Sequence, residues 1–330
     1  MEEPVANIES DEPFITVVIP TRNREDLLGD LLDSLADQTH PTERMELIVV
    51  DNSSEDDTAD VVQAFSDSVP FEVRYFVTDY KTPAGSRNFG TEHAKGGIVA
   101  FIDSDCVATP QWLAQLEAGF SDESIGLVQG RTAPNPTQER HLFEKTISIT
   151  EEGAVYETCN IAYRKHLVEE VGGFSDEYEP FWPFGGEDMD LAWKVKRAGH
   201  ASVFVDEAVV YHHVFKISAW QWLIGPRSAV IWPLLVRKFP EIRAHLFGRY
   251  FLFPITAFFD LLVLGVVLAL CLHPWFAWLA LPYVVIRYSD TDRSKNPFFR
   301  LLRIVVCLPR AVVLMLTLLY ASIRFRCIVL

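Results

Sequence analysis

The sequence predicts an α/β protein with a doubly wound, mainly parallel sheet, followed by an α-helical tail that associates with a membrane. Between residues 14 and 105, short apolar runs alternate with segments of helical periodicity, which is the pattern of strands joined by crossover helices. Several of these runs end in Asp, Asn or Ser, as strands do at the ligand-binding edge of an open α/β sheet. Beyond residue 240 the chain becomes apolar and basic.

The charge of the chain is divided between its two parts. Residues 1–240 contain 19 Lys and Arg against 41 Asp and Glu, a net charge of −22, whereas residues 241–330 contain 10 against 4, a net charge of +6. An acidic part of this size argues against nucleic-acid binding, which requires a basic surface. A basic, apolar part suits an anionic membrane surface, so we expect membrane lipids among the partners.

Four buried strands are expected first, each a run of apolar and β-branched residues that ends at a polar turn. These strands cover residues 14–19, 47–50, 71–77 and 97–102. Helices are expected between them at 27–35, where leucines recur at helical spacing, at 55–65 and from Pro83. A dinucleotide-binding fold would need G-x-G-x-x-G after the first strand, where this chain has P-T-R-N-R, so we exclude a dehydrogenase.

The next hundred residues continue the alternation less regularly, and 131–152 give no clear pattern. Helices are expected at 110–120, 167–171 and 187–198, the last with acids in its first turn and bases in its last turn. Strands are expected at 125–129, 159–165, 201–205 and 208–211. An aromatic, Gly-rich loop over 178–186 precedes the helix that starts at Glu187.

Two aspartates one residue apart follow the fourth strand, as Asp103-Ser104-Asp105. A turn just past the strand lets both carboxylates approach one ligand, and hard oxygen ligands suit Mg²⁺ or Mn²⁺. The alternative is an ordinary strand-ending turn, because Asp and Ser are also favoured there.

A series of short motifs resembles the family 2 glycosyltransferases, whose catalytic domain has the A-type, Rossmann-like, nucleotide-sugar-binding fold. In chain order the motifs are V-V-I-P-T-R-N-R, V-V-D-N-S-S, A-G-S-R-N-F-G, F-I-D-S-D, C-N-I-A-Y-R-K, G-G-F-S, G-G-E-D-M-D-L and Y-H-H. The resemblance covers residues 14–213 and implies an enzyme that transfers a sugar from a UDP-, GDP- or dTDP-sugar donor.

The resemblance also implies a donor site at the ends of the first, second and fourth strands. Asp51 would accept a hydrogen bond from an imide N–H of the base. The alternative is that its side chain only forms a local turn with the residues that follow. Arg87 would approach the nucleotide or its phosphates, or else lie on the surface. The full set for the donor is Pro20, Thr21, Arg22, Asn23, Asp51, Asn52, Gly85, Arg87, Asn88, Asp103 and Ser104.

A divalent cation, Mn²⁺ or Mg²⁺, is implied beside the donor diphosphate. Asp105 would hold it, together with Asp103 and with a histidine that follows the last strand, His212 or His213. Such a cation offsets the charge that develops on the departing nucleoside diphosphate.

The acids at the start of the helix after the Gly-rich loop are the catalytic candidates, Asp188 as general base and Glu187 beside it. A carboxylate there can take the proton of an acceptor hydroxyl during a single displacement, which inverts the anomeric configuration. The alternative is that these acids only favour the helix dipole. We place the acceptor near Trp182, Gly185, Gly186 and Asn160.

The processive synthases of this family carry Q-x-x-R-W after the base, and Q-W-L-I-G-P-R from Gln221 does not fit that motif, so we expect non-processive transfer. Two alternatives stay open. One is a polyprenyl-phosphate glycosyl synthase, whose phosphate acceptor needs no base. The other is a non-catalytic, membrane-tethered protein that binds nucleotide sugars or glycans.

The remaining segments predict attachment to the cytoplasmic face of a membrane. Residues 251–272 are long and apolar enough to span a bilayer, and with 275–286 they form a predicted hairpin over 251–286. The basic loop at 287–300 places that side in the cytoplasm. Residues 214–248 are expected to be an amphipathic, interfacial helical connector before a hydrophobic membrane region at 249–330. Within that region, residues 301–323 are expected to be interfacial or spanning helices, and residues 1–13 are an acidic tail without a secretion signal.

Overall fold

The computed structural model describes residues 14–80, 82–182, 185–289 and 297–330, so the predicted acidic tail and part of the basic loop lie outside the described residues. The chain separates into two compact units. The sheet unit comprises Met1–Glu139, Thr146–Asp176 and Leu191–His213, and the helical unit comprises Arg140–Lys145, Glu177–Asp190 and Val214–Leu330. Residues 140–145 and 177–190, which we placed in the 14–213 domain, cluster with the helical unit.

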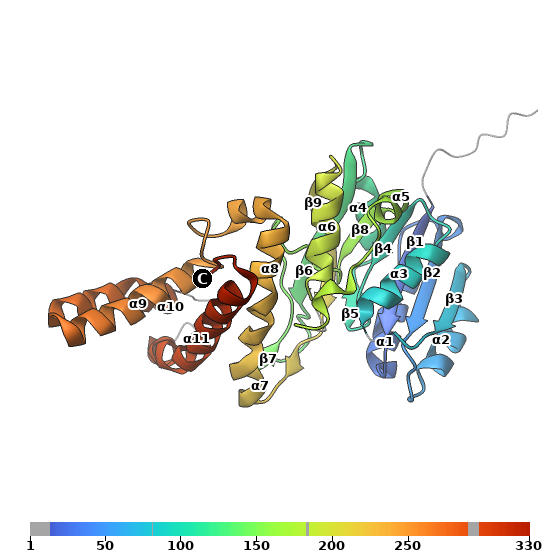
Figure 1. Ribbon diagram of the computed structural model, residues 1–330. Coiled ribbons are helices and arrows are strands. Elements are labelled where there is room, and N and C mark those ends of the chain that lie inside the picture. The colour runs from blue at the N-terminus through green and yellow to red at the C-terminus, as the bar shows by residue number, and fades with distance from the viewer. Residues whose placement is uncertain (1–13, 81, 183–184, 290–296) are drawn as a thin grey trace, which may run out of the picture. The chain divides into compact units, whose positions relative to one another are not determined.

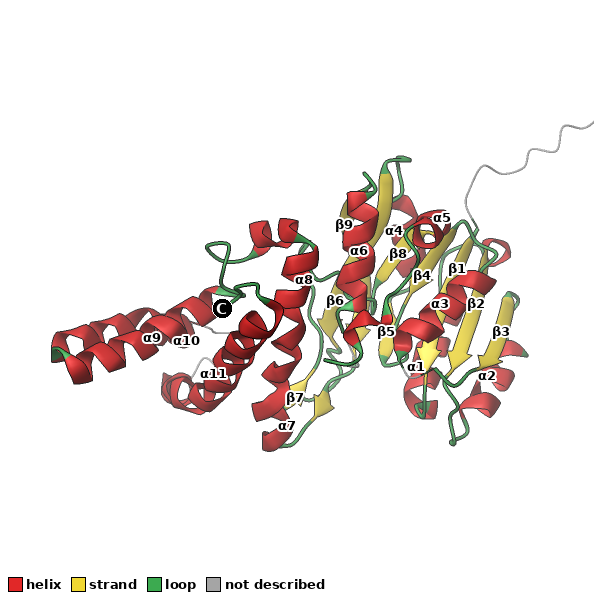
Figure 2. Ribbon diagram, in the orientation of Figure 1, coloured by secondary structure: helices red, strands yellow, loops and turns green. Residues whose placement is uncertain are grey.

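The sheet unit is built on an eight-stranded sheet among the described residues, in the order β3-β2-β1-β4-β8-β6-β9-β5 (Figures 1 and 2). Strands β1 to β4 pair in parallel, as does β6 with β9, whereas β8 and β5 run antiparallel to their neighbours. The strands are β1 (Ile15–Thr21), β2 (Met45–Asp51), β3 (Glu72–Val77), β4 (Ile98–Phe101), β5 (Cys106–Ala108), β6 (Ile125–Pro134), β8 (Ile161–Arg164) and β9 (Ala201–His212). The predicted doubly wound, mainly parallel fold is confirmed.

The helices of this unit follow the apolar periodicity of the sequence. In α1, the leucines at 28, 31, 32 and 35 are all buried, and Pro83 begins α3 at a position where its missing N–H costs nothing. The helices are α1 (Glu25–Ala36), α2 (Thr58–Ser66), α3 (Pro83–His93), α4 (Trp112–Ala118) and α5 (Lys165–Glu170), with a short 3₁₀ turn at η1 (Thr42–Arg44). The residues of α6 (Glu187–Arg197) and of the 3₁₀ turn η2 (Asp176–Tyr178) are divided between the two units.

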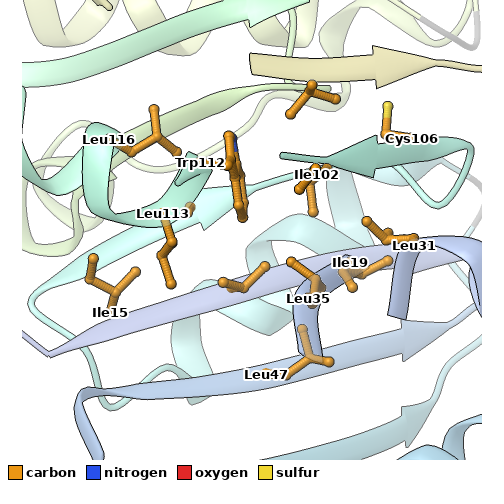
Figure 3. Close-up of a cluster of buried hydrophobic side chains, with 14 of the residues drawn as sticks. Ile15, Ile19, Leu31, Leu35, Leu47, Ile102, Cys106, Trp112, Leu113 and Leu116 are labelled. Carbon is orange, nitrogen blue, oxygen red and sulfur yellow. The ribbon is translucent and has the colours of Figure 1, made fainter. Parts of the chain in front are cut away.

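One apolar cluster joins α1 and α4 to the sheet (Figure 3). Leu31 and Leu35 of α1 lie in it with Ile19 of β1 and Trp112 of α4, all fully buried. Each such side chain contributes roughly 1.5–3 kcal/mol to folding. The Trp112 indole N–H donates to Asn160 Oδ1 at 2.8 Å, so its polar atom is satisfied inside the core. This packing fixes the strand ends that carry the polar residues.

The structure differs from the strand prediction at β9, which is continuous where we expected separate strands at 201–205 and 208–211. Asp206 and Glu207 break the apolar pattern, but the backbone stays extended. The register against β6 shifts between Gly130 and Thr132 and accommodates the extra residues. Arg131, between those two residues, forms an ion pair with Asp206. Strand β5 was not predicted, because its three residues are too few to show a periodic pattern of apolar side chains.

The helical unit contains a two-stranded ladder followed by helices. Its elements are β7 (Glu144–Lys145), β10 (Phe215–Lys216), α7 (Ala219–Ile224), η3 (Gly225–Ile231), α8 (Trp232–Lys238), η4 (Pro240–His245), α9 (Pro254–Cys271), η5 (Pro274–Ala280), α10 (Leu281–Ser289) and α11 (Pro297–Phe325). Helices α9 and α10 lie side by side as a hairpin (Figure 1). We expected Pro309 to interrupt the last segment, but α11 continues through it.

Two helices within the described residues are long and apolar enough to cross a membrane. They are α9 and the part of α11 from Arg300 to Phe325, and only 17% and 22% of their apolar windows are buried inside the protein. Trp275 and Trp278, at the turn of the hairpin, are 70% and 63% exposed. Apolar surface that is left uncovered in this way is compatible with membrane association.

Candidate functional site

The predicted donor residues gather where β1, β2 and β4 end. Parallel pairing places Thr21 beside Asp51 in the register of β1 and β2, and the N–H of Asn52 donates to the Thr21 carbonyl at 2.8 Å. Asp103, Ser104 and Asp105 follow β4, the other neighbour of β1. The carboxyl ends of neighbouring parallel strands therefore bring three separate motifs to one edge of the sheet.

Asp51 is 2% exposed and its carboxylate is held by the protein on both oxygens. Oδ1 accepts from the Ser54 N–H at 2.9 Å and the Ser54 hydroxyl at 2.6 Å, and Oδ2 accepts from the Tyr75 hydroxyl. Burial, reinforced by the hydrogen bond and charge of Asp51, raises the pKa of Tyr75. The local turn that we considered as the alternative is thus present. A carboxylate has about four acceptor positions, so Oδ2 keeps one for a ligand.

Two polar atoms at this edge are buried and bond to no described residue, Thr21 Oγ1 and Asn52 Oδ1. Buried polar atoms are nearly always paired, so these two are suited to a ligand. Asn23, exposed like Arg22, has a left-handed backbone with φ of 50° and accepts the Glu55 N–H at 2.8 Å. Pro20, before this turn, is half-buried.

Each aspartate after β4 faces an arginine. Arg87 of α3 is 4% exposed and donates to Asp103 Oδ1 at 2.8 Å, so its surface alternative is wrong. Arg24, just before α1, forms an ion pair with Asp105 Oδ2. We did not predict a role for Arg24, although it is the second arginine of the P-T-R-N-R motif. Ser104, between the aspartates, is 3% exposed.

The two histidines at the end of β9 have different surroundings. His212 is 3% exposed, and its Nε2 lies 3.6 Å from Asp105 Oδ1. Its Nδ1 lies 2.8 Å from the His213 carbonyl oxygen. His213 instead donates its backbone N–H to the Asp105 carbonyl at 2.9 Å, and its Nδ1 accepts from Gln138 at 2.7 Å. The Nε2 of His212 therefore lies beside the Asp105 carboxylate, whereas the Nδ1 of His213 is bonded to Gln138.

Cys106 lies beside this pair, because it faces His212 across the β5–β9 ladder. A ligand atom from each of Asp105, Cys106 and His212 lies within 4.8 Å of the others. Burial, and then the charges of Cys159 and Asp105, raise the pKa of the Cys106 thiol well above its usual value. Cys106 also belongs to the apolar cluster beneath the sheet, so we count it with the core.

Two further predicted residues, Asn160 and Asn88, bind backbone atoms of the protein through their side chains, and a third, Gly85, packs closely against a ring. Asn160 is fully buried, and its amide donates to the carbonyls of Arg131 and Ala208 at 2.8 and 2.9 Å. We therefore assign it to the sheet and not to the acceptor. Asn88 bonds through both amide atoms to the backbone of Phe174. A side chain at Gly85 would place a Cβ 2.6 Å from the Tyr80 ring.

The Gly-rich loop and the start of α6 belong to the helical unit up to Asp190. Gly185 and Gly186 have φ of 136° and 102°, and a Cβ at Gly186 would lie 2.8 Å from the Tyr178 ring. Glu187 is 7% exposed, whereas Asp188, the second residue of α6, is only half-buried. Trp182, within the loop, is also half-buried.

A buried network that the sequence did not reveal anchors this helix start. Asp190 is fully buried, and its Oδ1 accepts from the Tyr178 hydroxyl at 2.7 Å and lies 2.5 Å from Lys238 Nζ of α8. Lys238 also bonds to Glu177 at 2.6 Å. Burial lowers the pKa of Lys238, but the hydrogen bonds and charges of Asp190 and Glu177 outweigh it, so that the pKa is raised overall. No sequence motif links Lys238 to Asp190.

Removing Lys238 should weaken the helical unit. We expect Lys238→Met to lower the free energy of unfolding by about 1–3 kcal/mol, because it leaves the Asp190 carboxylate buried without its cation. The double variant Lys238→Met/Asp190→Asn should recover part of this loss, and Glu177→Gln, on the exposed side of the lysine, should cost little. Urea unfolding followed by circular dichroism measures all three. A double variant less stable than Lys238→Met would contradict this account.

The fold is similar to those of solved glycosyltransferases. The mannosyltransferase PcManGT from Pyrobaculum calidifontis, solved in complex with GDP-Man and Mn²⁺, aligns with a TM-score of 0.60 and 18% identity over 96% of this chain and 88% of its own. Residues 1–349 of S. aureus TarS, solved in complex with UDP-GlcNAc, align with a TM-score of 0.53 and 18% identity over 94% and 91%. This likeness shows that the sheet unit has the A-type glycosyltransferase fold.

Sequence comparison identifies the family. Residues 16–174, just under half of the chain, match the model of glycosyl transferase family 2. It is 27% identical to glycosyltransferase AglE of Haloferax volcanii over 67% of this chain and 75% of that protein. It is 28% identical to a validoxylamine A glucosyltransferase of Streptomyces hygroscopicus, of which it spans about half, 51%. The predicted glycosyltransferase activity and family are confirmed.

Proposed function

We propose that this enzyme is a metal-dependent, inverting, non-processive transferase that moves a sugar from a nucleotide-sugar donor to a hydroxyl of a lipid-linked or membrane-proximal acceptor. The observation that carries the proposal is the convergence of Asp51, Asp103, Asp105 and His212 at one edge of the sheet unit. The complexes of the structural neighbours with GDP-Man and UDP-GlcNAc support a nucleoside diphosphate as the leaving group.

The donor would bind through the polar atoms at the ends of β1 and β2. Thr21 Oγ1, Asn52 Oδ1 and the remaining acceptor position of Asp51 Oδ2 can pair with the base and ribose. Arg87 holds Asp103 in place and adds a positive charge close to the phosphates. We therefore expect donor binding to depend on residues from three separate motifs.

The residues of the proposed metal site fit Mn²⁺ or Mg²⁺. Asp105 offers a carboxylate oxygen and His212 a ring nitrogen 3.6 Å away, so these two residues would hold the ion. When bound, the ion would offset the charge on the departing diphosphate. Asp103 would contribute through the ribose or a water molecule, since Arg87 already pairs with its carboxylate.

Asp188 is the proposed general base. During transfer the acceptor oxygen forms a bond to the anomeric carbon, the bond from that carbon to the diphosphate oxygen breaks, and the acceptor proton passes to the Asp188 carboxylate. Asp188 suits this role better than Glu187 because it is the less buried of the two. Gly185 and Gly186 leave the adjoining backbone without side chains, which lets an acceptor approach, and Trp182 offers a ring beside it.

Membrane attachment would place the acceptor within reach of the enzyme. The exposed apolar surfaces of α9 and α11 support insertion, and the basic residues that follow the hairpin support a cytoplasmic orientation. A nucleotide-sugar donor made in the cytoplasm would then be used at that face of the membrane.

A thermal-shift panel tests this function most directly. We expect one of UDP, GDP and dTDP, with Mn²⁺, to raise the unfolding temperature, because a ligand at 100 times its Kd stabilises the folded state by about 2.7 kcal/mol. Leaving out Mn²⁺ should remove most of the shift. If every nucleotide is without effect, and no nucleoside diphosphate is released from sugar donors in the presence of membranes, the enzyme assignment to these donors is wrong.

A further inference from the structure

The Asp51 carboxylate, which the proposed function assigns to the base of the donor, can accept few further hydrogen bonds. An ionised carboxylate accepts about four, two at each oxygen. At Oδ1 both positions are filled by one residue, because the backbone N–H of Ser54 donates at 2.9 Å and its hydroxyl donates at 2.6 Å. At Oδ2 one position is filled by the hydroxyl of Tyr75. One position, on Oδ2, therefore remains for the base.

The direction of the Ser54 hydroxyl is fixed by a second contact. Its oxygen accepts the backbone N–H of Asn23, in the loop after β1, at 2.8 Å. A hydroxyl has one hydrogen to donate, and here that hydrogen is directed to Asp51 Oδ1. The Glu55 N–H donates to the Asn23 side chain in return, at 2.8 Å, so the loops after β1 and β2 hold each other. Freeing Oδ1 for a ligand would break a contact that belongs to this pair of loops.

The Tyr75 hydroxyl is also a permanent donor to Asp51. Burial, and then the hydrogen bond and charge of Asp51, raise the pKa of Tyr75, so the phenol keeps its proton throughout the neutral range. The backbone carbonyl of Asp51 accepts the Thr78 N–H at 2.8 Å, which fixes the residue at the end of β2. The carboxylate is thus held from both sides, and it could not turn both oxygens toward a base without losing these bonds.

The three bases expected of the donor differ in how many hydrogen bonds they require of one carboxylate. Uracil and thymine each present a single imide N–H. Guanine presents a ring N–H and an amino N–H side by side, and together these pair with both oxygens of a carboxylate. At Asp51 that pairing would direct the amino group at Oδ1, which Ser54 already fills. A buried donor without an acceptor weakens binding, so guanine is disfavoured at this position.

We propose that the donor is a uridine or thymidine diphosphate sugar, and that Ser54 excludes guanine by filling the oxygen that its amino group would need. Ser54 acts through Asp51 and is therefore a positioning residue. The inference rests on the proposed function in one respect, that Asp51 contacts the base.

The test measures the affinities of UDP, dTDP and GDP for the full chain by calorimetry, with Mn²⁺ present. We expect UDP or dTDP to bind at least about tenfold more tightly than GDP, a ratio that corresponds to about 1.4 kcal/mol. The UDP and dTDP measurements separate the two pyrimidines, which differ in the 2′-hydroxyl and the 5-methyl group. GDP bound as tightly as the better pyrimidine would overturn the proposal.

Substitutions at Ser54 test its role directly, with the ratio of pyrimidine to GDP affinity as the readout. Ser54→Ala should lower this ratio at least about fivefold, because Oδ1 then has a position for the guanine amino group. Ser54→Thr keeps a hydroxyl and should keep the ratio. Tyr75→Phe is the matched control, since it also removes one hydrogen bond from Asp51 but leaves Oδ1 filled, and it should keep the ratio even where all affinities fall. An unchanged ratio in Ser54→Ala would refute the role of Ser54.

Asn52 supplies a further check, because its Oδ1 is buried without a hydrogen bond to any described residue. We assign this oxygen to a ribose hydroxyl, which uridine and guanosine share, so Asn52→Ala should weaken UDP and GDP by the same factor. A loss confined to GDP would show that guanine is recognised there and would overturn the proposal. If no nucleoside diphosphate binds with Mn²⁺, the proposed function fails, whereas binding that favours GDP refutes this inference alone.

Discussion

Asp188→Asn should lower the rate of sugar transfer by about 10²–10⁴, because the acceptor hydroxyl then loses the group that takes its proton. Asparagine has nearly the same shape as aspartate and cannot accept that proton. Donor binding should be unchanged, since none of the residues proposed to hold the donor belongs to α6. Single-turnover transfer, combined with nucleotide binding by calorimetry, separates the two effects.

Glu179→Gln is the matched control for this variant. Glu179 lies near the start of the same glycine-rich loop, so its replacement removes a nearby carboxylate without touching α6. Its activity should stay within about twofold of the unmodified enzyme. If Asp188→Asn transfers sugar at the normal rate with donor bound, then Asp188 is not the base, and a phosphate acceptor, which needs none, becomes the better explanation.

Asp105→Asn should abolish metal-dependent donor binding and reduce transfer by about 10²–10³, the scale expected when one electrostatic group at a leaving group is lost. Asp105 contributes the carboxylate that faces His212 at 3.6 Å, and an amide oxygen binds Mn²⁺ far more weakly than a carboxylate does. Electron paramagnetic resonance of Mn²⁺ counts bound ions in the presence of the nucleoside diphosphate.

Two further variants sharpen the interpretation of Asp105→Asn. Arg24 forms an ion pair with Asp105, so the variant also removes a structural contact, and a thermal unfolding curve must show that the sheet unit remains folded. His212→Ala should weaken Mn²⁺ binding, whereas His213→Ala should leave it nearly unchanged, because His213 Nδ1 is occupied by Gln138. Full Mn²⁺ affinity in Asp105→Asn would contradict the assigned metal site.

Secondary structure was predictable where one physical signal dominated. The observed ends of β1, β2, β4 and α1 lie within two or three residues of the predicted ones. Strong apolar periodicity is compatible with few other assignments of secondary structure. Short or irregular elements were missed. Strand β5 has three residues, and β9 continues past Asp206 and Glu207 because its pairing, not its composition, keeps it extended.

Local sequence therefore determined the doubly wound fold, the glycosyltransferase family and the motifs at the strand ends, because each depends on hydrophobic pattern or on neighbouring residues. Distance along the chain hid the rest. The contact of Arg87 with Asp103, the approach of the His212 ring to Asp105, the use of Asn160 inside the sheet and the pairing of Lys238 with Asp190 all depend on which segments pack together. Side-chain burial and hydrogen bonding between distant segments arise only when the chain has folded, so no motif could report them.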